Sequence, residues 1–177
     1  IVRLRDRPGP TVLPLPAPWP DVPLVRTYVG DDGAFVRAAA QRCGFHLALN
    51  DRPELGVSRS IRFGLKPMAD TDACMFCVAD QPLLRRETLA GMLDVYEADT
   101  ILMISHNGKS GNPVIFPASL YGELKRLVGE ESGKTVACRH EHLLRLYHLA
   151  EASQLMDIDT QEDLKTIEAR LSGPPDA

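Results

Sequence analysis

The feature that most restricts the fold is an unbroken apolar run over residues 73–79, Ala-Cys-Met-Phe-Cys-Val-Ala. A strand with one solvated face alternates apolar and polar residues, whereas an unbroken run is typical of a parallel strand buried on both faces. Burial on both faces requires helices on either side of the sheet. The run therefore predicts a layered α/β domain with a mostly parallel sheet.

The chain around this run alternates between strand-like and helix-like patterns. Further strands are predicted at Leu24–Val29, Phe45–Leu49, Thr100–Ser105, Pro113–Phe116 and Leu155–Ile158, while Leu143–Leu149 is ambiguous. Helices are predicted at Gly33–Arg42, Ser58–Leu65, Arg86–Glu97, Ser119–Leu127, Lys134–His140 and Thr160–Leu171. Thr160 and Asp163 form a capping-box-like pair at the start of the last helix. In such a fold, ligands bind at the carboxyl ends of the strands.

The first 23 residues contain seven prolines. Because proline lacks a backbone donor and fixes φ, this stretch cannot form a helix or a central strand. We therefore divide the chain into an irregular segment at 1–23, one domain at 24–171 and a tail at 172–177.

Composition narrows the classes of function. The net charge of −4, from 20 basic and 24 acidic residues, argues against nucleic acid or an anionic membrane as a partner. We expect no transmembrane helix, because no run of about 18 apolar residues is present. The four cysteines are sparse and lie mostly in apolar segments, which suits reduced thiols in a cytoplasmic protein. Cys74 and Cys77 are spaced as in redox or zinc motifs, but we interpret them as buried small hydrophobes.

Two acidic segments are candidates for a metal site. Asp80 follows the apolar run directly, so it is predicted at the carboxyl edge of the sheet. Asp157 and Asp159 end another predicted strand, two residues apart. Carboxylates of this kind bind Mg²⁺ together with substrate phosphates. The alternative is a structural role for each, in which Asp80 caps a turn near Pro82 and the second group stabilises a helix start.

Two glycine-containing segments are candidates for ligand binding. Gly56, Ser58, Arg59 and Ser60 begin a predicted helix and offer backbone N–H groups, hydroxyls and a guanidinium to an anion or a base. Taken alone, such a helix start is more often an ordinary N-cap. The segment 108–113, which includes Gly111, Asn112 and Pro113, indicates either a close approach to a ligand or a hairpin tip.

Four segments, taken in order, resemble MobA/MocA-like NTP transferases. They are Asn50–Leu65, Val78–Pro82, Gly111–Phe116 and Asp157–Thr160. Within this family the chain is most similar to the molybdenum cofactor cytidylyltransferases and to related accessory proteins of molybdenum hydroxylases. The resemblance covers roughly residues 24–171, and four motifs in sequence are far more specific than any one of them.

The resemblance implies a three-layer, Rossmann-like nucleotidyltransferase fold and a reaction. The family transfers a nucleoside monophosphate from an NTP, here CTP, to a phosphorylated acceptor, here molybdopterin, and releases pyrophosphate. A molybdenum hydroxylase apoenzyme is a further implied partner.

The resemblance also assigns roles to residues. It implies that Asp80 and Asp159, with Asp157, hold Mg²⁺. Gly56, Ser58, Arg59 and Ser60 would then bind the nucleotide, and Gln81, Gly111, Asn112 and Pro113 would line the acceptor side.

The sequence departs from the family pattern in two places. Ala79 replaces the glycine of the usual Gly-Asp-Gln-Pro motif. The family also begins with a central strand, a Gly-rich loop that carries an Arg and a Lys, and a long helix. Here Arg7–Pro14 retains only a vestige of that loop, so the first strand and helix are degraded. Two other functions therefore stay open, an inactive cofactor-binding accessory protein and a sugar- or alcohol-phosphate nucleotidyltransferase.

Overall fold

The computed structural model describes residues 27–30, 38, 41–42 and 46–171. The proline-rich segment, most of the predicted helix Gly33–Arg42 and the tail lie outside these residues. The strands are β1 Thr27–Gly30, β2 His46–Leu49, β3 Ala73–Phe76, β4 Ile101–His106, β5 Lys109–Pro117 and β6 Leu144–His148. The helices are α2 Val57–Leu65, α3 Arg86–Asp94, α4 Tyr121–Arg126, α5 Gly133–Arg139 and α6 Gln161–Leu171. Short 3₁₀ turns lie at Pro53–Leu55, Lys66–Met68, Ala118–Leu120, Glu141–Leu143 and Ala152–Leu155.

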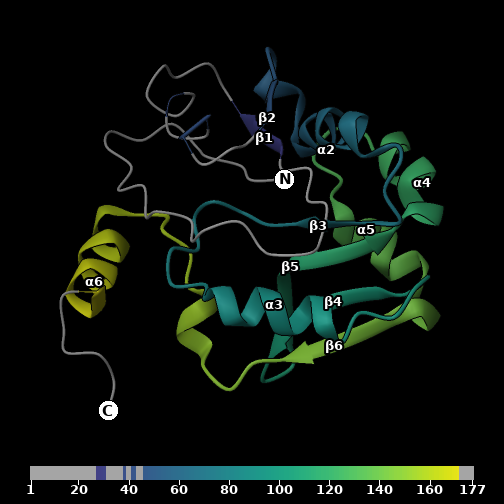
Figure 1. Ribbon diagram of the computed structural model, residues 1–177. Coiled ribbons are helices and arrows are strands. Elements are labelled where there is room, and N and C mark those ends of the chain that lie inside the picture. Colours follow the sequence, from purple (N-terminus) through teal and green to yellow (C-terminus); the bar gives the residue numbers. More distant parts are fainter. Residues whose placement is uncertain (1–26, 31–37, 39–40, 43–45, 172–177) are drawn as a thin grey trace.

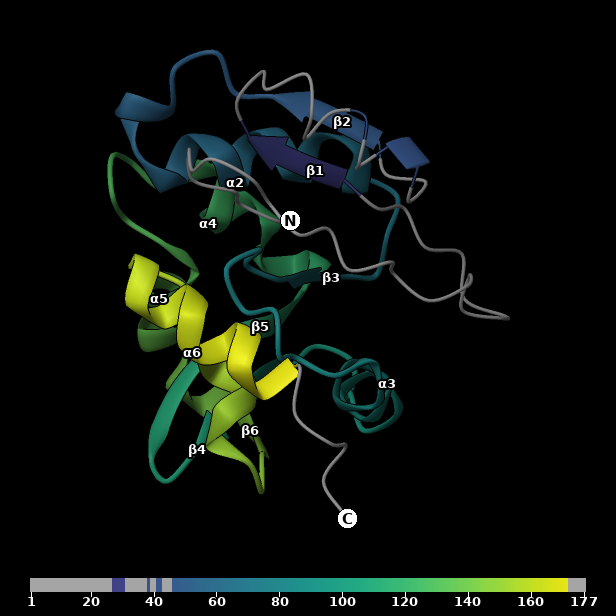
Figure 2. The ribbon, with the colours of Figure 1, turned by 90° about the vertical axis from the view of Figure 1, so that its left-hand side faces the viewer.

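Helices cover both faces of a four-stranded sheet, which confirms the three-layer architecture (Figures 1 and 2). Side chains of α2, α4 and α5 form the larger core on one face, around Leu65, Phe116, Leu124 and Val136. On the other face α3 places Met92 against a second core that includes Leu102, Ile104 and Ile115. The central strands therefore bury both faces, as the apolar run predicted.

The prediction of a mostly parallel sheet is wrong, because two of the three strand pairs in the four-stranded sheet are antiparallel. The strand order is β3-β5-β4-β6, with β5 antiparallel to both of its neighbours and β4 parallel to β6. The cause is a tight turn at Asn107 and Gly108, both with positive φ, which returns β5 directly alongside β4. The strands β3, β4 and β6 still share one direction, so their carboxyl ends meet at one edge.

Two strand predictions need correction. The strand at residues 73–79 ends at Phe76, so residues 77–79 belong to a loop and Asp80 does not follow the strand directly. The predicted strand Leu155–Ile158 is also wrong, because Ala152–Leu155 is a 3₁₀ turn. In this segment the backbone N–H of Met156 donates to the carbonyl of Ser153 and that of Ile158 to the carbonyl of Asp80, so neither joins a strand ladder. The ambiguous stretch at 143–149 is strand β6.

The strands β1 and β2 form a separate parallel pair. Among the described residues no strand connects this pair to β3, although α2 packs against both strands and against α4. The segment in which the family's first strand is expected lies outside the described residues. None of the helices in the described residues is long and apolar enough to cross a membrane.

Candidate functional site

The two acidic segments lie together in the structure. The backbone N–H of Ile158 donates to the carbonyl of Asp80 over 2.8 Å, although the residues are far apart in sequence. Beside this bond, Nε2 of Gln81 donates to Oδ1 of Asp157 over 3.0 Å. The loop after β3 and the run 157–159 thus form one acidic edge, at the carboxyl end of β3.

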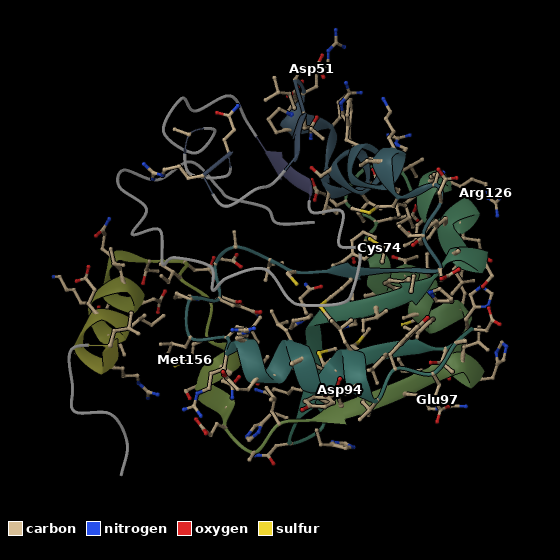
Figure 3. All side chains as sticks on the ribbon, viewed as in Figure 1. Asp51, Cys74, Asp94, Glu97, Arg126 and Met156 are labelled. Atoms are coloured by element: carbon tan, nitrogen blue, oxygen red, sulfur yellow. The ribbon has the colours of Figure 1, made fainter. Side chains whose placement is uncertain are left out.

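A second set of bonds clamps the same two segments a few residues away. The side chain of Gln154 is 6% exposed, and its Oε1 accepts from the hydroxyl of Thr88 over 2.6 Å and from the backbone N–H of Arg85 over 3.2 Å. The guanidinium of Arg85 makes a bidentate pair with Glu151 at 2.8 and 2.7 Å. Met156, two residues after Gln154, lies near the amino-terminal end of α3 in Figure 3.

The start of α6 confirms the predicted capping box. The backbone N–H of Asp163 donates to Oγ1 of Thr160 over 3.1 Å, and the N–H of Thr160 donates to Oδ2 of Asp163 over 2.7 Å. The same carboxylate accepts from the N–H of Asp159 over 3.1 Å. The position of Asp159 is therefore coupled to the start of α6.

The acidic edge does not make a complete metal cage by itself. In the part of the chain that the structure describes, no three His, Cys, Asp or Glu side chains are arranged to hold a metal ion. Asp80 is partly buried, and Asp157 and Asp159 are exposed. Mg²⁺ usually takes one or two carboxylates and completes its shell with water and substrate phosphates, so hard oxygen donors on two adjoining segments fit such an ion.

The second cluster lies at the start of α2. Gly56 has φ +92°, and a side chain there would meet the carbonyl oxygen of Gly129 at 2.2 Å. That carbonyl accepts from the backbone N–H of Ser58 over 3.2 Å. The hydroxyl of Ser58 is fully buried and has no hydrogen-bond partner within the described residues. Gly56 is therefore required by backbone geometry and by close packing, whatever it binds.

Polar neighbours surround the other two predicted nucleotide-binding residues. The side-chain amide of Asn50 donates to the hydroxyl of Ser60 over 3.1 Å, and Nε of Arg59 donates to Oδ1 of Asn50 over 2.9 Å. Arg59 also forms an ion pair with Asp51, and this hydrogen bond lowers the pKa of the Asp51 carboxyl. Asp51 marks the exposed end of this cluster in Figure 3. The network holds Arg59 against the loop before α2.

The acceptor-side segment lies on β5. Phe76 pairs with Val114, so Asn112 and Pro113 continue β5 past the end of β3, toward the loop that carries Asp80. Between Met103 and Ile104 the register of β4 with β5 shifts, because Val114 is opposite Met103 and Gly111 is opposite Ile104. Pro113 is buried, whereas Gly111 and Asn112 are partly exposed. The segment is thus a bulged strand at the same edge, while the hairpin tip itself is Asn107 and Gly108.

Cys74 is buried as predicted and Cys77 is partly buried, whereas Cys138 is exposed and Cys43 lies outside the described residues. Cys74, Cys77 and Cys138 are free, and burial raises the pKa of the Cys74 thiol to about 11 and also raises that of Cys77. Thiols held in the neutral form are poor nucleophiles and poor metal ligands.

A family comparison agrees with this arrangement. The model of the MobA-like NTP transferase domain matches residues 22–144, which is more than half of the 177 residues. The chain belongs to the MobA-like NTP transferase family. The matched residues include the α2 cluster, the Asp80 loop and β5, and they end before the run 157–159 of this MobA-like chain. A comparison with curated protein sequences gives no match.

Solved structures share the fold of this MobA-like chain at low identity. Rv0371c from Mycobacterium tuberculosis H37Rv is 23% identical, with 80% of this chain and 73% of that chain covered and a TM-score of 0.65. A complex of Rv0371c with manganese is also known. Molybdopterin-guanine dinucleotide biosynthesis protein A from Archaeoglobus fulgidus is 19% identical. The match covers 82% of this chain and 78% of that chain, with a TM-score of 0.59. A cytidylyltransferase from Leptospira borgpetersenii is 16% identical. The match covers 85% of this chain and 69% of that chain, with a TM-score of 0.65.

The structure also reveals residues that sequence reasoning missed. Thr88, Gln154 and the pair Arg85–Glu151 were not candidates, because partners 66 residues apart give no local pattern. In the sequence, a glutamine next to a predicted strand gives no specific signal.

Proposed function

We propose that this chain transfers CMP from CTP to the phosphate of molybdopterin, the organic part of the molybdenum cofactor, and releases pyrophosphate. The observation that carries the proposal is the contact between the Asp80–Gln81 loop and the run 157–159 at the carboxyl edge of β3. This is where parallel α/β sheets bind ligands. The likeness to proteins named for cytidylyl transfer and for molybdopterin-guanine dinucleotide biosynthesis supports the choice of substrates.

In the proposed reaction an acceptor phosphate oxygen attacks the α-phosphorus of the triphosphate. The bond from that phosphorus to the oxygen bridging the β-phosphate breaks, and pyrophosphate leaves. Such a transfer needs positioning and charge neutralisation more than covalent participation of the protein. We assign positioning of the acceptor to Gln81, Gly111, Asn112 and Pro113, and binding of the nucleotide to Gly56, Ser58, Arg59 and Ser60.

A divalent cation fits the acidic edge. Asp80 and Asp159, with Asp157 beside them, would hold Mg²⁺ or Mn²⁺, which would neutralise charge on the triphosphate when bound. The support is the donor set itself, hard carboxylate oxygens on two segments joined by the Ile158–Asp80 hydrogen bond. The manganese complex of Rv0371c is compatible with this choice.

The test is release of pyrophosphate from CTP in the presence of Mg²⁺ and molybdopterin. We expect release that depends on all three components and that is lower with GTP or ATP. Absence of release from a folded sample that still binds molybdopterin would rule out the enzymatic function. Faster turnover of a sugar phosphate than of molybdopterin would show that the acceptor is a sugar phosphate, while nucleotidyl transfer would remain the reaction.

The second candidate is a non-catalytic accessory protein that binds the cofactor and a molybdenum hydroxylase apoenzyme. One observation favours it, the division of the described strands into a β1–β2 pair and a separate four-stranded sheet. The resemblance implies that the family's first strand and its triphosphate-binding loop come from the N-terminal part of the chain, which lies outside the described residues. Binding of molybdopterin without CTP binding, measured by calorimetry, would decide for this candidate.

A further inference from the structure

A hollow lies between α5, the 3₁₀ turn Glu141–Leu143 that follows it, and the strands β4, β5 and β6. Its volume is about 70 Å³. Because a bound water needs about 10–15 Å³, the hollow has room for about five waters or for one six-membered ring. None of the site residues assigned so far lines it.

The floor of the hollow is apolar. Met103 of β4, Ala137 of α5 and Leu144 of β6 form it. Met103 and Ala137 are buried and Leu144 is partly buried, so these side chains are held in place by the core around them. An apolar floor with a few polar groups at its rim is typical of a site that binds a small organic molecule, and it suits the flat face of a ring.

The rim of the hollow carries opposite charges. Lys134, Glu141 and the hydroxyl of Ser110 line it, and all three residues are exposed. Within the described residues, neither Lys134 nor Glu141 forms an ion pair. An ammonium group only donates hydrogen bonds and a carboxylate only accepts them. The rim therefore fits a neutral ring that carries an oxygen and an amino group, whereas Glu141 would repel a phosphate.

A buried hydroxyl lies on the same face of the sheet. Ser105 is two residues after Met103 on β4 and pairs with Ser110 of β5, so its side chain projects toward the side of the hollow. Ser105 is 1% exposed, and its hydroxyl has no hydrogen-bond partner among the described residues. Buried polar groups are normally paired, so a ligand that reaches past Ser110 would supply a missing partner.

The hollow adjoins the segment that we assign to the acceptor. Ser110 directly precedes Gly111 on β5, and Asn112 and Pro113 continue that strand past the end of β3. A ligand in the hollow can therefore extend along β5 toward the loop that carries Asp80.

We propose that this hollow binds the amino-oxo pyrimidine ring of the acceptor's pterin, with Lys134 donating to the ring oxygen and Glu141 accepting from the amino group. The inference rests on the proposed function, because it places one part of the acceptor of that reaction. It makes Lys134 and Glu141 residues that select the acceptor, on a part of the chain that none of the four family-like segments includes.

Cys138 allows the test, because its thiol is exposed and lines the hollow. The rate of its alkylation by iodoacetamide is measured by mass spectrometry of the peptide that contains it. Pterin, cytidine and inorganic phosphate are the three probes, and the affinity for pterin is measured from pterin fluorescence. CTP and Mg²⁺ are left out, so the result does not depend on turnover.

We expect pterin to slow alkylation of Cys138 severalfold, and cytidine and phosphate to leave the rate unchanged. Lys134→Ala and Glu141→Ala should each weaken pterin binding by roughly tenfold, since each removes a hydrogen bond from a charged group. The matched controls are Lys125→Ala on α4 and Glu168→Ala on α6, both at exposed positions, and they should retain the wild-type affinity. Because all four positions are exposed, we expect every variant to fold.

Protection of Cys138 by cytidine instead of pterin would overturn the assignment to the acceptor, and protection by phosphate would overturn a site for a neutral ring. Pterin that does not bind, or that binds without protecting Cys138, would also overturn the inference. Equal losses of affinity in the test and control variants would have the same consequence.

The proposed function fails separately. Protection by pterin without pyrophosphate release from CTP would overturn the enzymatic function and keep the ring site. Pyrophosphate release without protection would keep the enzymatic function and overturn the ring site alone.

Discussion

At the scale of single residues, Gly56 is fixed by two independent constraints. Its φ of +92° lies in a region that side-chain-bearing residues rarely adopt, and the carbonyl of Gly129 occupies the space where a Cβ would lie. Gly108 also has a positive φ, at +78°, but open space surrounds it. A substitution at Gly108 therefore tests backbone strain alone, whereas one at Gly56 tests strain and close packing together.

Gly56→Ala is expected to lower the free energy of unfolding by about 2–5 kcal/mol, from strain and overpacking together. Gly108→Ala should cost about 1–2 kcal/mol, from strain alone. Urea denaturation followed by circular dichroism measures both. Equal losses in the two variants would show that the contact with Gly129 is relieved in solution.

The carboxylates of the acidic edge give the residue-scale test of chemistry. Asp80→Asn and Asp159→Asn should each reduce pyrophosphate release by about a hundredfold or more, since a charged donor in a transfer site is lost while its shape is kept. Asp94→Asn is the control, because Asp94 is exposed at the last residue of α3. Retained activity in both test variants would remove the acidic edge from the mechanism.

The buried thiol of Cys74 predicts a dependence of stability on alkaline pH. Burial raises its pKa from 9.0 to about 11 in the folded state. Because the folded state holds this proton more tightly, the stabilisation is fully present below pH 9 and is lost as the pH rises toward 11. We expect the free energy of unfolding to fall by about 1–3 kcal/mol over this interval, and less in Cys74→Val. Urea titrations at pH 8.5 and 10.5 measure the fall, and an identical fall in the variant would assign it to other groups.

At the scale of elements, the sequence predicted most helices and strands because their signals are local. The capping box at Thr160 and Asp163 marks the start of α6 within one residue, and the alternation before residue 130 locates α2 and α3 closely. The failures involve contacts that are not local. Ala73–Ala79 is apolar throughout, but its pairing with β5 ends at Phe76 opposite Val114, although β5 itself continues through Pro113 and Asn112. Leu155–Ile158 is apolar enough for a strand, but its N–H groups bond to the carbonyls of Ser153 and Asp80 instead of to a strand ladder.

The capping box allows an element-scale prediction. Thr160→Ala removes the hydroxyl that accepts from the N–H of Asp163, and should destabilise the start of α6 by about 1 kcal/mol. Because α6 is anchored chiefly by Ile167, amide exchange within α6 should speed up several-fold while exchange in β4 stays the same. A uniform change across both elements would show that α6 unfolds together with the sheet.

At the scale of the whole molecule, the sequence predicted the three layers, which the structure confirms. It also predicts a site that includes Gly56, Asp80 and Gly111, but it does not predict how these segments meet. The structure joins Asp80 with the run 157–159, and it places the α2 start in a separate cluster with Asn50 and Gly129. Tertiary contacts of this range depend on packing that no sequence window contains.

The division of the described strands predicts unequal stability. A two-stranded pair is marginal by itself, whereas the four-stranded sheet is covered on both faces. Amides of β1 and β2 should therefore exchange at least about tenfold faster than those of β4 and β5 under native conditions. Equal protection, measured by NMR or mass spectrometry, would indicate one cooperative sheet in solution.

The clamp between residues 80–88 and 151–158 also sets the order in which this molecule can mature during translation. Its bonds join residues at least 66 positions apart, so the ribosome has already released β3, β5 and α3 while the partner segment is still unsynthesised. Long-range contacts of this kind form late, after local elements are in place. A nascent chain therefore carries an incomplete acidic edge until residues 157–159 have emerged.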